Sequence, residues 1–293
     1  MGSTKALFII NPISGGINKT GFPDTVQSVL GGSDVDAQSV FSERPGHAEE
    51  LSRKAVADGF DFVFSVGGDG TMNEVARGVL NTNVGLGLVP LGSGNGLARH
   101  MGLPLKIKDA IALAKKHSLL RIDSGTINDK PFFNMAGVGF DAHIGNVFAT
   151  SKERGFKTYV VSTITEFINY KPEKYKLVNG QVREKTAFLI SFANSSQYGN
   201  NAYIAPQASL QDGKIDICVL KPFHPIYFPE LSVRLFNKTI NNSQFIESFK
   251  TDHIIIEREK DGVIHLDGDP HIMGKTLEMK VNPSSLNILV PIK

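Results

Sequence analysis

The sequence predicts a protein of two parts, an α/β domain followed by an antiparallel β-sandwich. Up to about residue 125, short apolar strands alternate with helix-patterned segments, as in a parallel sheet covered by helices. Beyond that point, strand-like segments with alternating polarity dominate, and Asn-Gly or Asp-Gly pairs separate several of them. We place the boundary between the two parts near residue 125.

Taken in order, the first domain is predicted to contain strands at 6–10, 35–41, 62–66 and 84–90, and helices at 23–30, 46–57, 72–80 and 108–116, leading to 119–123. The second is predicted to contain strands at 131–135, 174–178, 186–194, 214–220, 253–259, 262–267, 276–281 and 286–291, with helices at 156–169 and 226–236. Hairpin turns are expected at Asn179-Gly180, Asp212-Gly213 and Asp261-Gly262.

The composition limits the possible classes of function. The 293 residues include 31 basic and 29 acidic ones, which argues against bulk binding of nucleic acid. The single cysteine, Cys218, leaves no intrachain disulfide and fits a reducing compartment. We find no run of 18 apolar residues and no signal-peptide pattern, so we expect a cytoplasmic protein that could still touch a membrane surface.

The central motif is Val66-Gly67-Gly68-Asp69-Gly70-Thr71, which lies between an apolar strand and a helix. Its glycines allow positive φ and close approach of a ligand, and the helix N-terminus favours a phosphate. An acid in such a turn makes sense if Asp69 handles a proton or a metal ion. The alternative is a solvated Asp-Gly turn.

Two further polar, glycine-rich turns follow strands of the same predicted sheet. They are Asn11-Pro12-Ile13-Ser14-Gly15-Gly16 and Gly92-Ser93-Gly94-Asn95-Gly96. Because ligands bind at the carboxyl ends of parallel strands, we expect all three turns to form one site. No Gly-Lys-Ser/Thr sequence closes the first turn, so it is not a Walker loop.

Carboxylates also follow apolar strands in the second half. Asp141 follows an apolar strand and is predicted to point into the mouth of a cleft, with a helix N-cap as the less favoured alternative. Asp267 and Asp269 would share one side of an extended chain and suit a base and a metal contact, or else mark a β-turn. Arg154 and Lys157 could reach phosphates or begin a solvated helix. The three glycine-rich turns, which could bind phosphates, together with the aspartates at strand ends suggest phosphoryl transfer.

With these motifs in hand, the chain resembles the superfamily of diacylglycerol kinases and sphingosine kinases of the bacterial type. The motifs that carry the resemblance are Asn11-Pro12-Ile13-Ser14-Gly15, Gly67-Gly68-Asp69-Gly70-Thr71 with Asn73-Glu74, Gly92-Ser93-Gly94-Asn95, Gly137-Val138-Gly139-Phe140-Asp141-Ala142 and Asp267-Gly268-Asp269. The resemblance covers nearly the whole chain. It implies a nucleotide-binding α/β domain at residues 1–125, which the C-terminal strand at 286–293 would complete, and a β-sandwich lipid domain at 126–285. It also implies ATP as co-substrate with Mg²⁺, and a lipid acceptor at a membrane surface.

The resemblance also implies roles for individual residues. Asp69 would be the catalytic acid or base, with Asp267 its rival, and Asp141 would meet the polar head of the lipid. The nucleotide would be bound by Asn11, Ser14, Gly15, Ser42, Gly67, Gly68, Gly70, Thr71, Glu74, Gly92, Ser93, Gly94, Asn95 and Asp269. No metal ligands are assigned, and a homodimer stays open.

The sequence departs from the family pattern at two positions. Gly96 stands where bacterial diacylglycerol kinases usually carry a second Asp, so the third turn looks more like that of sphingosine kinases. Asp269 replaces a usual Glu. The acceptor could therefore be a diacylglycerol-like or a sphingoid lipid. The alternatives are an NAD kinase, which shares the Gly-Gly-Asp-Gly-Thr turn, and a nucleotide-sensing module without catalysis.

Overall fold

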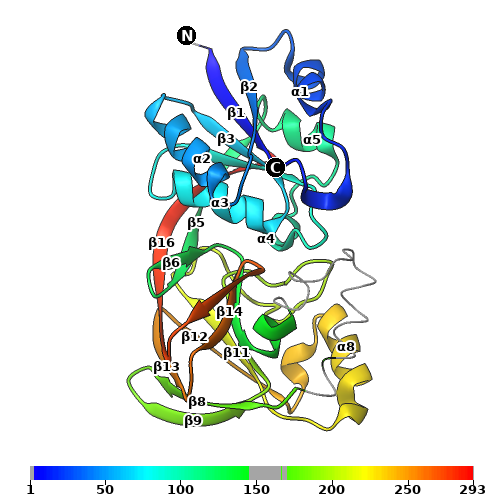
Figure 1. Ribbon diagram of the computed structural model, residues 1–293. Helices are drawn as coiled ribbons and strands as arrows, with labels where there is room; N and C mark the ends of the chain where they lie inside the picture. Colours follow the sequence, from blue (N-terminus) through cyan, green and yellow to red (C-terminus); the bar gives the residue numbers. More distant parts are fainter. Residues whose placement is uncertain (1–2, 145–165, 167–169, 293) are drawn as a thin grey trace. The chain divides into compact units, whose positions relative to one another are not determined.

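The computed structural model describes residues 3–144, 166 and 170–292, which form two compact units (Figure 1). Unit 1 comprises the chain up to Asp123 together with the segment from Pro283 onward, and unit 2 spans Ser124–Asn282. Two long strands, β5 (Ser118–Ile127) and β16 (Thr276–Val290), run from one unit into the other. The predicted helix at 156–169 and the candidates Arg154 and Lys157 lie outside the described residues.

Unit 1 is built on a parallel sheet. Its strand order is β2 (Val35–Phe41), β1 (Thr4–Ile10), β3 (Phe62–Gly67), β4 (Gly85–Pro90) and the C-terminal part of β16. All four pairings are parallel, and β16 joins β4 at Asn287 and Ile288. Strands β3 and β4 and most of β1 are apolar on both faces, because helices cover both faces of the sheet.

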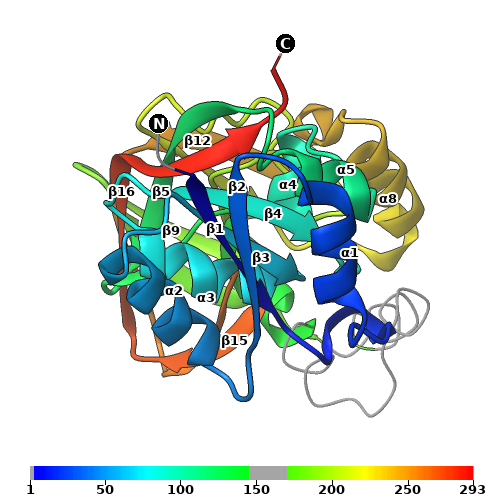
Figure 2. The ribbon, with the colours of Figure 1, turned by 90° about the horizontal axis from the view of Figure 1, so that it is seen from above.

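Helices form the outer layers of unit 1. On one face, α1 (Phe22–Leu30) and α5 (Ile107–Ala112) bury apolar side chains against Phe8 and Phe64 of the sheet. On the other face, α3 (Asp69–Val79) packs against β3, and α2 (His47–Ala57) packs against α3 (Figure 2). A five-residue helix, α4 (Gly96–His100), follows the third glycine turn. Unit 1 is thus a three-layer α/β domain.

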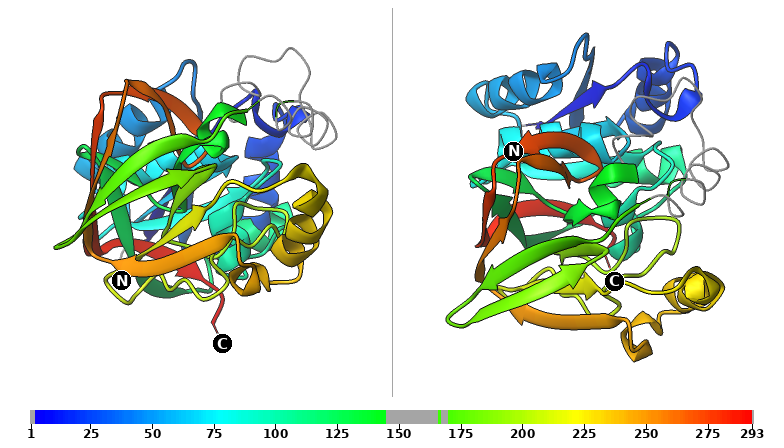
Figure 3. Two further views of the ribbon diagram at one scale, coloured as in Figure 1. Left: turned by 90° about the horizontal axis from the view of Figure 1, so that it is seen from below. Right: turned by 60° about the horizontal axis from the view of Figure 1, so that its bottom comes forward.

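Unit 2 is an antiparallel β-sandwich (Figure 3). One sheet pairs the N-terminal part of β16 with β13 (His253–Arg258), β8 (Glu173–Val178) and β9 (Val182–Ala187), and β5 carries β6 (Lys130–Phe132) beside β16. The other has the order β12 (Ile246–Thr251), β11 (Ile215–Leu220), β10 (Leu189–Ala193), β7 (Met135–Gly139), β14 (Gly262–Leu266) and β15 (Asp269–Met273). Apolar side chains of both sheets share one core.

Three short helices lie beside the second sheet. The turns η2 (Pro225–Tyr227) and η3 (Ile240–Asn242) flank α8 (Phe228–Phe236), so the predicted helix at 226–236 is confirmed. A remaining 3-10 turn, η1 (Ser14–Gly16), belongs to the first glycine turn of unit 1.

Several predicted elements were wrong in the second half. The strand expected at 131–135 is divided into β6 and β7, because the N–H groups of Phe133 and Asn134 donate to the Asp267 carboxylate instead of to a neighbouring strand. The strand expected at 186–194 breaks at Phe188, and the two strands expected at 276–281 and 286–291 form the single strand β16. Strands β12 and β15 were not predicted.

The hairpin predictions had mixed outcomes. Asn179-Gly180 joins the paired strands β8 and β9, as expected. Asp261-Gly262 does not form a hairpin, because β13 and β14 belong to different sheets, and Asp212-Gly213 precedes β11 without a strand before it. The hairpin instead lies at Asp267-Gly268, where both residues have positive φ, 49° and 91°, between β14 and β15.

Candidate active site

The second and third glycine turns of unit 1 are in direct backbone contact. An ideal β-carbon on Gly92 would lie 2.6 Å from the Gly68 Cα atom, and one on Gly68 would lie 3.1 Å from the Gly92 Cα atom. Carbon atoms normally approach to about 3.5–4.0 Å. Each turn therefore needs glycine at this point so that the other can approach it.

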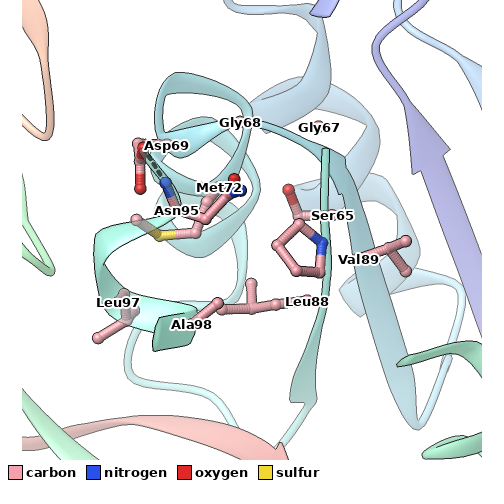
Figure 4. Close-up of a pocket in the computed structure, with 11 residues that line it drawn as sticks. Ser65, Gly67, Gly68, Asp69, Met72, Leu88, Val89, Asn95, Leu97 and Ala98 are labelled. Carbon is pink, nitrogen blue, oxygen red and sulfur yellow. Dashed lines mark hydrogen bonds between the residues drawn. The ribbon is translucent and has the colours of Figure 1, made fainter. Parts of the chain in front are cut away.

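Asp69 connects the same two turns through its carboxylate. Oδ2 accepts the Asn95 N–H at 2.8 Å (Figure 4), and Oδ1 accepts the Gly96 N–H at 2.9 Å. Asn95 itself has left-handed φ, and its side chain closes the turn by accepting from the Gly92 N–H and donating to the Gly92 carbonyl. The Asp69 carboxylate thus holds the third turn against the N-terminus of α3.

The first turn contacts both of the others. Asn11 Nδ2 donates to Thr71 Oγ1 at 2.9 Å, which joins the first turn to the second. Gly15 has a φ of 67°, and a β-carbon there would collide with the Leu91 carbonyl oxygen just before the third turn. The structure therefore brings the three turns together at the carboxyl end of the sheet.

A small cavity lies beneath the second and third turns. It is lined by Ser65, Gly67, Gly68, Asp69, Met72, Leu88, Val89, Pro90, Asn95, Leu97 and Ala98 (Figure 4). Its volume of ≈ 20 Å³ is enough for about one water molecule. A nucleotide does not fit inside this cavity, so a bound phosphate would lie outside it, against the backbone of the turns.

Two cations flank the turns, and the sequence analysis did not single out either of them. The Lys19 ammonium donates to the Ser14 carbonyl, and burial lowers the pKa of Lys19. Arg99 Nε donates to the Gly94 carbonyl at 3.1 Å. The signal that could have found them is their position, four residues after Gly15 and five after Gly94.

Other predicted nucleotide-binding residues of unit 1 have mainly structural contacts. Glu74 Oε2 accepts the Ala48 N–H at 3.1 Å and so satisfies a donor in the first turn of α2. Ser42 is buried, and its N–H donates to the Ile10 carbonyl. Ser93 is exposed at the tip of the third turn. Of these three residues, Ser93 has the most open position.

Asp267, in unit 2, is held by three backbone N–H groups. Oδ1 accepts from Asn134 at 2.8 Å and from Met135 at 2.9 Å, and Oδ2 accepts from Phe133 at 2.9 Å. The residue is only 3% exposed. Its carboxylate fixes the break between β6 and β7.

Asp269 does not share a side of the chain with Asp267, contrary to the sequence prediction. The two residues flank the Asp267-Gly268 turn, and Asp269 is exposed while Asp267 is buried. The prediction assumed an extended chain, which the two positive φ values of the turn exclude.

Asp141 lies in a buried polar cluster of unit 2. Its Oδ2 accepts hydrogen bonds from Ser191 Oγ and Tyr198 OH, each at 3.0 Å, and lies 3.0 Å from His265 Nε2. Burial alone would lower the pKa of His265, but the Asp141 carboxylate outweighs it, and Asp267 adds to the rise. Burial and Asp141 raise the pKa of Tyr198. The cluster therefore places the Asp141 carboxylate beside a buried histidine whose pKa it raises.

Gly137 provides the space for this cluster, because a β-carbon there would meet the Asp141 carboxylate and lie 2.6 Å from His265 Nε2. The sequence analysis did not single out His265, Ser191 or Tyr198. The available signal was the place of His265 on an apolar strand, two residues before Asp267.

Within residues 3–144, 166 and 170–292, no group of three or more His, Cys, Asp or Glu side chains is arranged to hold a metal ion. Mg²⁺ commonly takes only one or two carboxylates and completes its shell with water and substrate phosphates. Asp69 offers such a carboxylate, which is partly exposed at the N-terminus of α3. Asp69 therefore fits a Mg²⁺ ion that is shared with phosphates.

Comparison with known proteins adds two domain matches. Residues 5–127 match the diacylglycerol kinase catalytic domain, and residues 134–290 match the YegS C-terminal NAD kinase beta sandwich-like domain. A protein of Chromohalobacter salexigens named "Probable lipid kinase YegS-like" is 30% identical over 233 residues, covering 77% of this chain and 75% of that protein.

A Mycobacterium tuberculosis protein named "Diacylglycerol kinase" is 31% identical over 192 residues, covering 62% of each chain. The crystal structure of a diacylglycerol kinase from Bacillus anthracis superposes with a TM-score of 0.76 at 22% identity, covering 98% of this chain and 96% of that one. This last likeness shows a shared fold.

Proposed function

The chain belongs to the diacylglycerol kinase-like family of lipid kinases, and from that premise we propose that it transfers the γ-phosphate of ATP to a hydroxyl group of a diacylglycerol-like or sphingoid lipid. The observation that carries the proposal is the Asp69 carboxylate, which lies where two glycine turns meet at the N-terminus of α3. Phosphoryl transfer needs positioned phosphates, charge neutralisation and a group that accepts the hydroxyl proton.

The parts of unit 1 divide this work between them. The glycine turns let the phosphates approach the backbone, and the N-terminus of α3 favours their negative charge. Lys19 and Arg99 add positive charge beside the first and third turns. A Mg²⁺ ion held by Asp69 would neutralise phosphate charge when bound.

Asp69 is our candidate for the group that accepts the proton. It is partly exposed, whereas Asp267 is almost fully buried and has both lone pairs of Oδ1 engaged by backbone N–H groups. These contacts support an anchoring role for Asp267, which stays the alternative candidate for the group that accepts the hydroxyl proton. We further propose that Asp141, oriented by Ser191, Tyr198 and His265, contacts the polar head of the lipid.

In the decisive experiment, purified protein is incubated with labelled ATP, Mg²⁺ and a panel of diacylglycerols, monoacylglycerols and sphingoid bases. Label should appear in a lipid, and its identity names the acceptor class. If every lipid stays unlabelled while NAD is converted to NADP, the proposal is wrong and the NAD kinase alternative stands.

Asp69→Asn tests the residue itself. We expect turnover to fall at least about 10²-fold while the fold persists. Stability should drop by roughly 1.5–3 kcal/mol, because one charged hydrogen bond to the third turn becomes a donor facing a donor. Asp24→Asn is the matched control, since Asp24 is an exposed acid in the first turn of α1. Near-normal turnover of Asp69→Asn would remove Asp69 from the mechanism.

A further inference from the structure

Helix α8 of unit 2 exposes a stripe of apolar side chains. Ile226, Pro229, Val233 and Phe236 are spaced by three, four and three residues, which places them along one face of the helix and the preceding turn η2. Ile226 is 73% exposed, Val233 61% and Phe236 49%. We refer to these four residues as the α8 stripe.

The α8 stripe is not the face by which the helix packs on its own unit. Leu231 is buried, and Phe228 and Leu235 pack against a core cluster that includes Ile240 and Ile246. The helix is therefore apolar both inward and outward. A surface helix normally carries polar residues outward, and clustered exposed apolar residues mark an interaction surface.

The charges around the stripe indicate the kind of partner. Segment 221–238 contains Lys221, Arg234 and Lys238 against a single acid, Glu230. Glu230 is paired with Arg234 at 2.7 Å and Lys221 Nζ lies 3.9 Å from Glu247 Oε2, so Lys238 contributes most of the surplus positive charge beside the stripe. Lys238 lies over the Tyr203 ring, 4.5 Å from its centroid. An apolar stripe bordered by lysines matches an anionic lipid surface.

We infer that the α8 stripe lies in the interface of a bilayer containing anionic lipid. This inference rests on the proposed function, since a lipid with long acyl chains is presented to an enzyme at such a surface. The side chains would enter the acyl boundary while Lys221 and Lys238 stay among the headgroups. None of the helices among the described residues is long and apolar enough to cross a membrane, so this contact is interfacial.

The test is co-sedimentation of the full chain with vesicles, in the absence of ATP. Wild-type protein should bind vesicles of phosphatidylcholine mixed with phosphatidylglycerol more tightly than vesicles of phosphatidylcholine alone, and salt should weaken the binding. The triple variant Ile226→Ser, Val233→Ser, Phe236→Ser should bind the mixed vesicles at least about tenfold more weakly. The three side chains are exposed, so thermal unfolding should stay near that of the wild type.

Two further variants test the inference. Ile272→Ser is the matched control, because Ile272 is 83% exposed on β15. Strand β15 lies at the opposite end of the sheet from β12, the strand that η3 contacts, so this variant should bind vesicles like the wild type. Lys238→Asn should weaken binding to mixed vesicles roughly fivefold and leave binding to phosphatidylcholine unchanged. Lys238 has a φ of 64°, which Asn tolerates.

Activity toward lipid dispersed in detergent micelles separates this inference from the proposed function. The triple variant should phosphorylate dispersed lipid like the wild type and lose activity on vesicles. Equal vesicle binding by the triple variant and the wild type would overturn the inference. So would light scattering that shows a wild-type dimer which the triple variant dissolves, because the stripe would then be covered by a second copy.

Discussion

Replacing Gly92 by alanine tests the contact between the second and third turns. The new β-carbon would lie 2.6 Å from Gly68 Cα and 2.9 Å from Asn95 Oδ1. Since carbon atoms approach to about 3.5–4.0 Å, the two turns must separate by roughly 1 Å. Neither neighbour can yield easily, because one is backbone and the other closes the turn through Gly92 itself.

The displacement should act on turnover more than on folding. A misplacement of about 1 Å between reacting groups costs on the order of 10²-fold in rate, which corresponds to about 2.7 kcal/mol of transition-state stabilisation. Overpacking itself should cost roughly 1–3 kcal/mol of stability. We therefore expect a folded protein whose turnover with ATP falls about a hundredfold.

The assay measures phosphorylation of micellar lipid at saturating and limiting ATP, with thermal unfolding in parallel. Gly21→Ala is the control, because a β-carbon on Gly21 meets nothing within 4 Å and its φ is −86°. Turnover of Gly92→Ala within twofold of the Gly21→Ala value would refute the contact as a determinant of the site.

Three other outcomes are expected in unit 2. Asp267→Asn should lower the free energy of unfolding by roughly 2 kcal/mol, because the amide must turn its NH₂ group toward a backbone N–H. The control Asp269→Asn, at an exposed position, should change it by less than about 0.5 kcal/mol. Equal effects of the two variants in urea unfolding would contradict the anchoring role of Asp267. His265→Gln should lose most stability at acidic pH. Because the pKa of His265 is raised, its contact with Asp141 contributes fully to the stability of the fold below about pH 6.5, and this contribution is lost as pH rises through the folded-state pKa. A stability difference between variant and wild type that does not shrink with rising pH would contradict this contact. Asp141→Ala should raise the KM for lipid more than that for ATP in steady-state kinetics, and the reverse pattern would place Asp141 outside the lipid site.

Much of unit 1 could be predicted because its elements are local and strongly patterned. Strand β1 follows from an apolar run that ends just before Asn11-Pro12, and helix α1 follows from a periodic apolar pattern that ends at Gly31. The meeting of the three turns also followed from a general rule, that parallel strands end at one edge of a sheet. What no pattern could supply was the chemistry of the meeting point, since the bonds from Asn95 and Gly96 to Asp69 join residues that are 26 and 27 positions apart.

Unit 2 was harder to predict because its boundaries depend on contacts between distant residues. The break at Phe133 and Asn134 exists because their N–H groups donate to Asp267, more than 130 residues away. Strand β15 was missed because Asp269-Pro270 resembles a turn rather than a strand. The ion pair of His265 with Asp141 requires β14 and β7 to be neighbours, which the sequence order conceals.

The two aspartates that competed for one catalytic role show why motif and role must be separated. Asp69 and Asp267 each precede a glycine, and each accepts backbone N–H groups from a distant turn, so the Asp-Gly pattern reports a carboxylate that holds a turn in both cases. Burial distinguishes them, because Asp267 is 3% exposed and accepts three backbone N–H groups, while Asp69 is partly exposed at the N-terminus of α3. A carboxylate can hold a turn and also meet a phosphate-bound ion or a hydroxyl only where solvent reaches it. Asp69 satisfies that condition. The two Asp→Asn variants should therefore lose similar amounts of stability but separate in turnover, which only Asp69→Asn should lose by at least about 10²-fold.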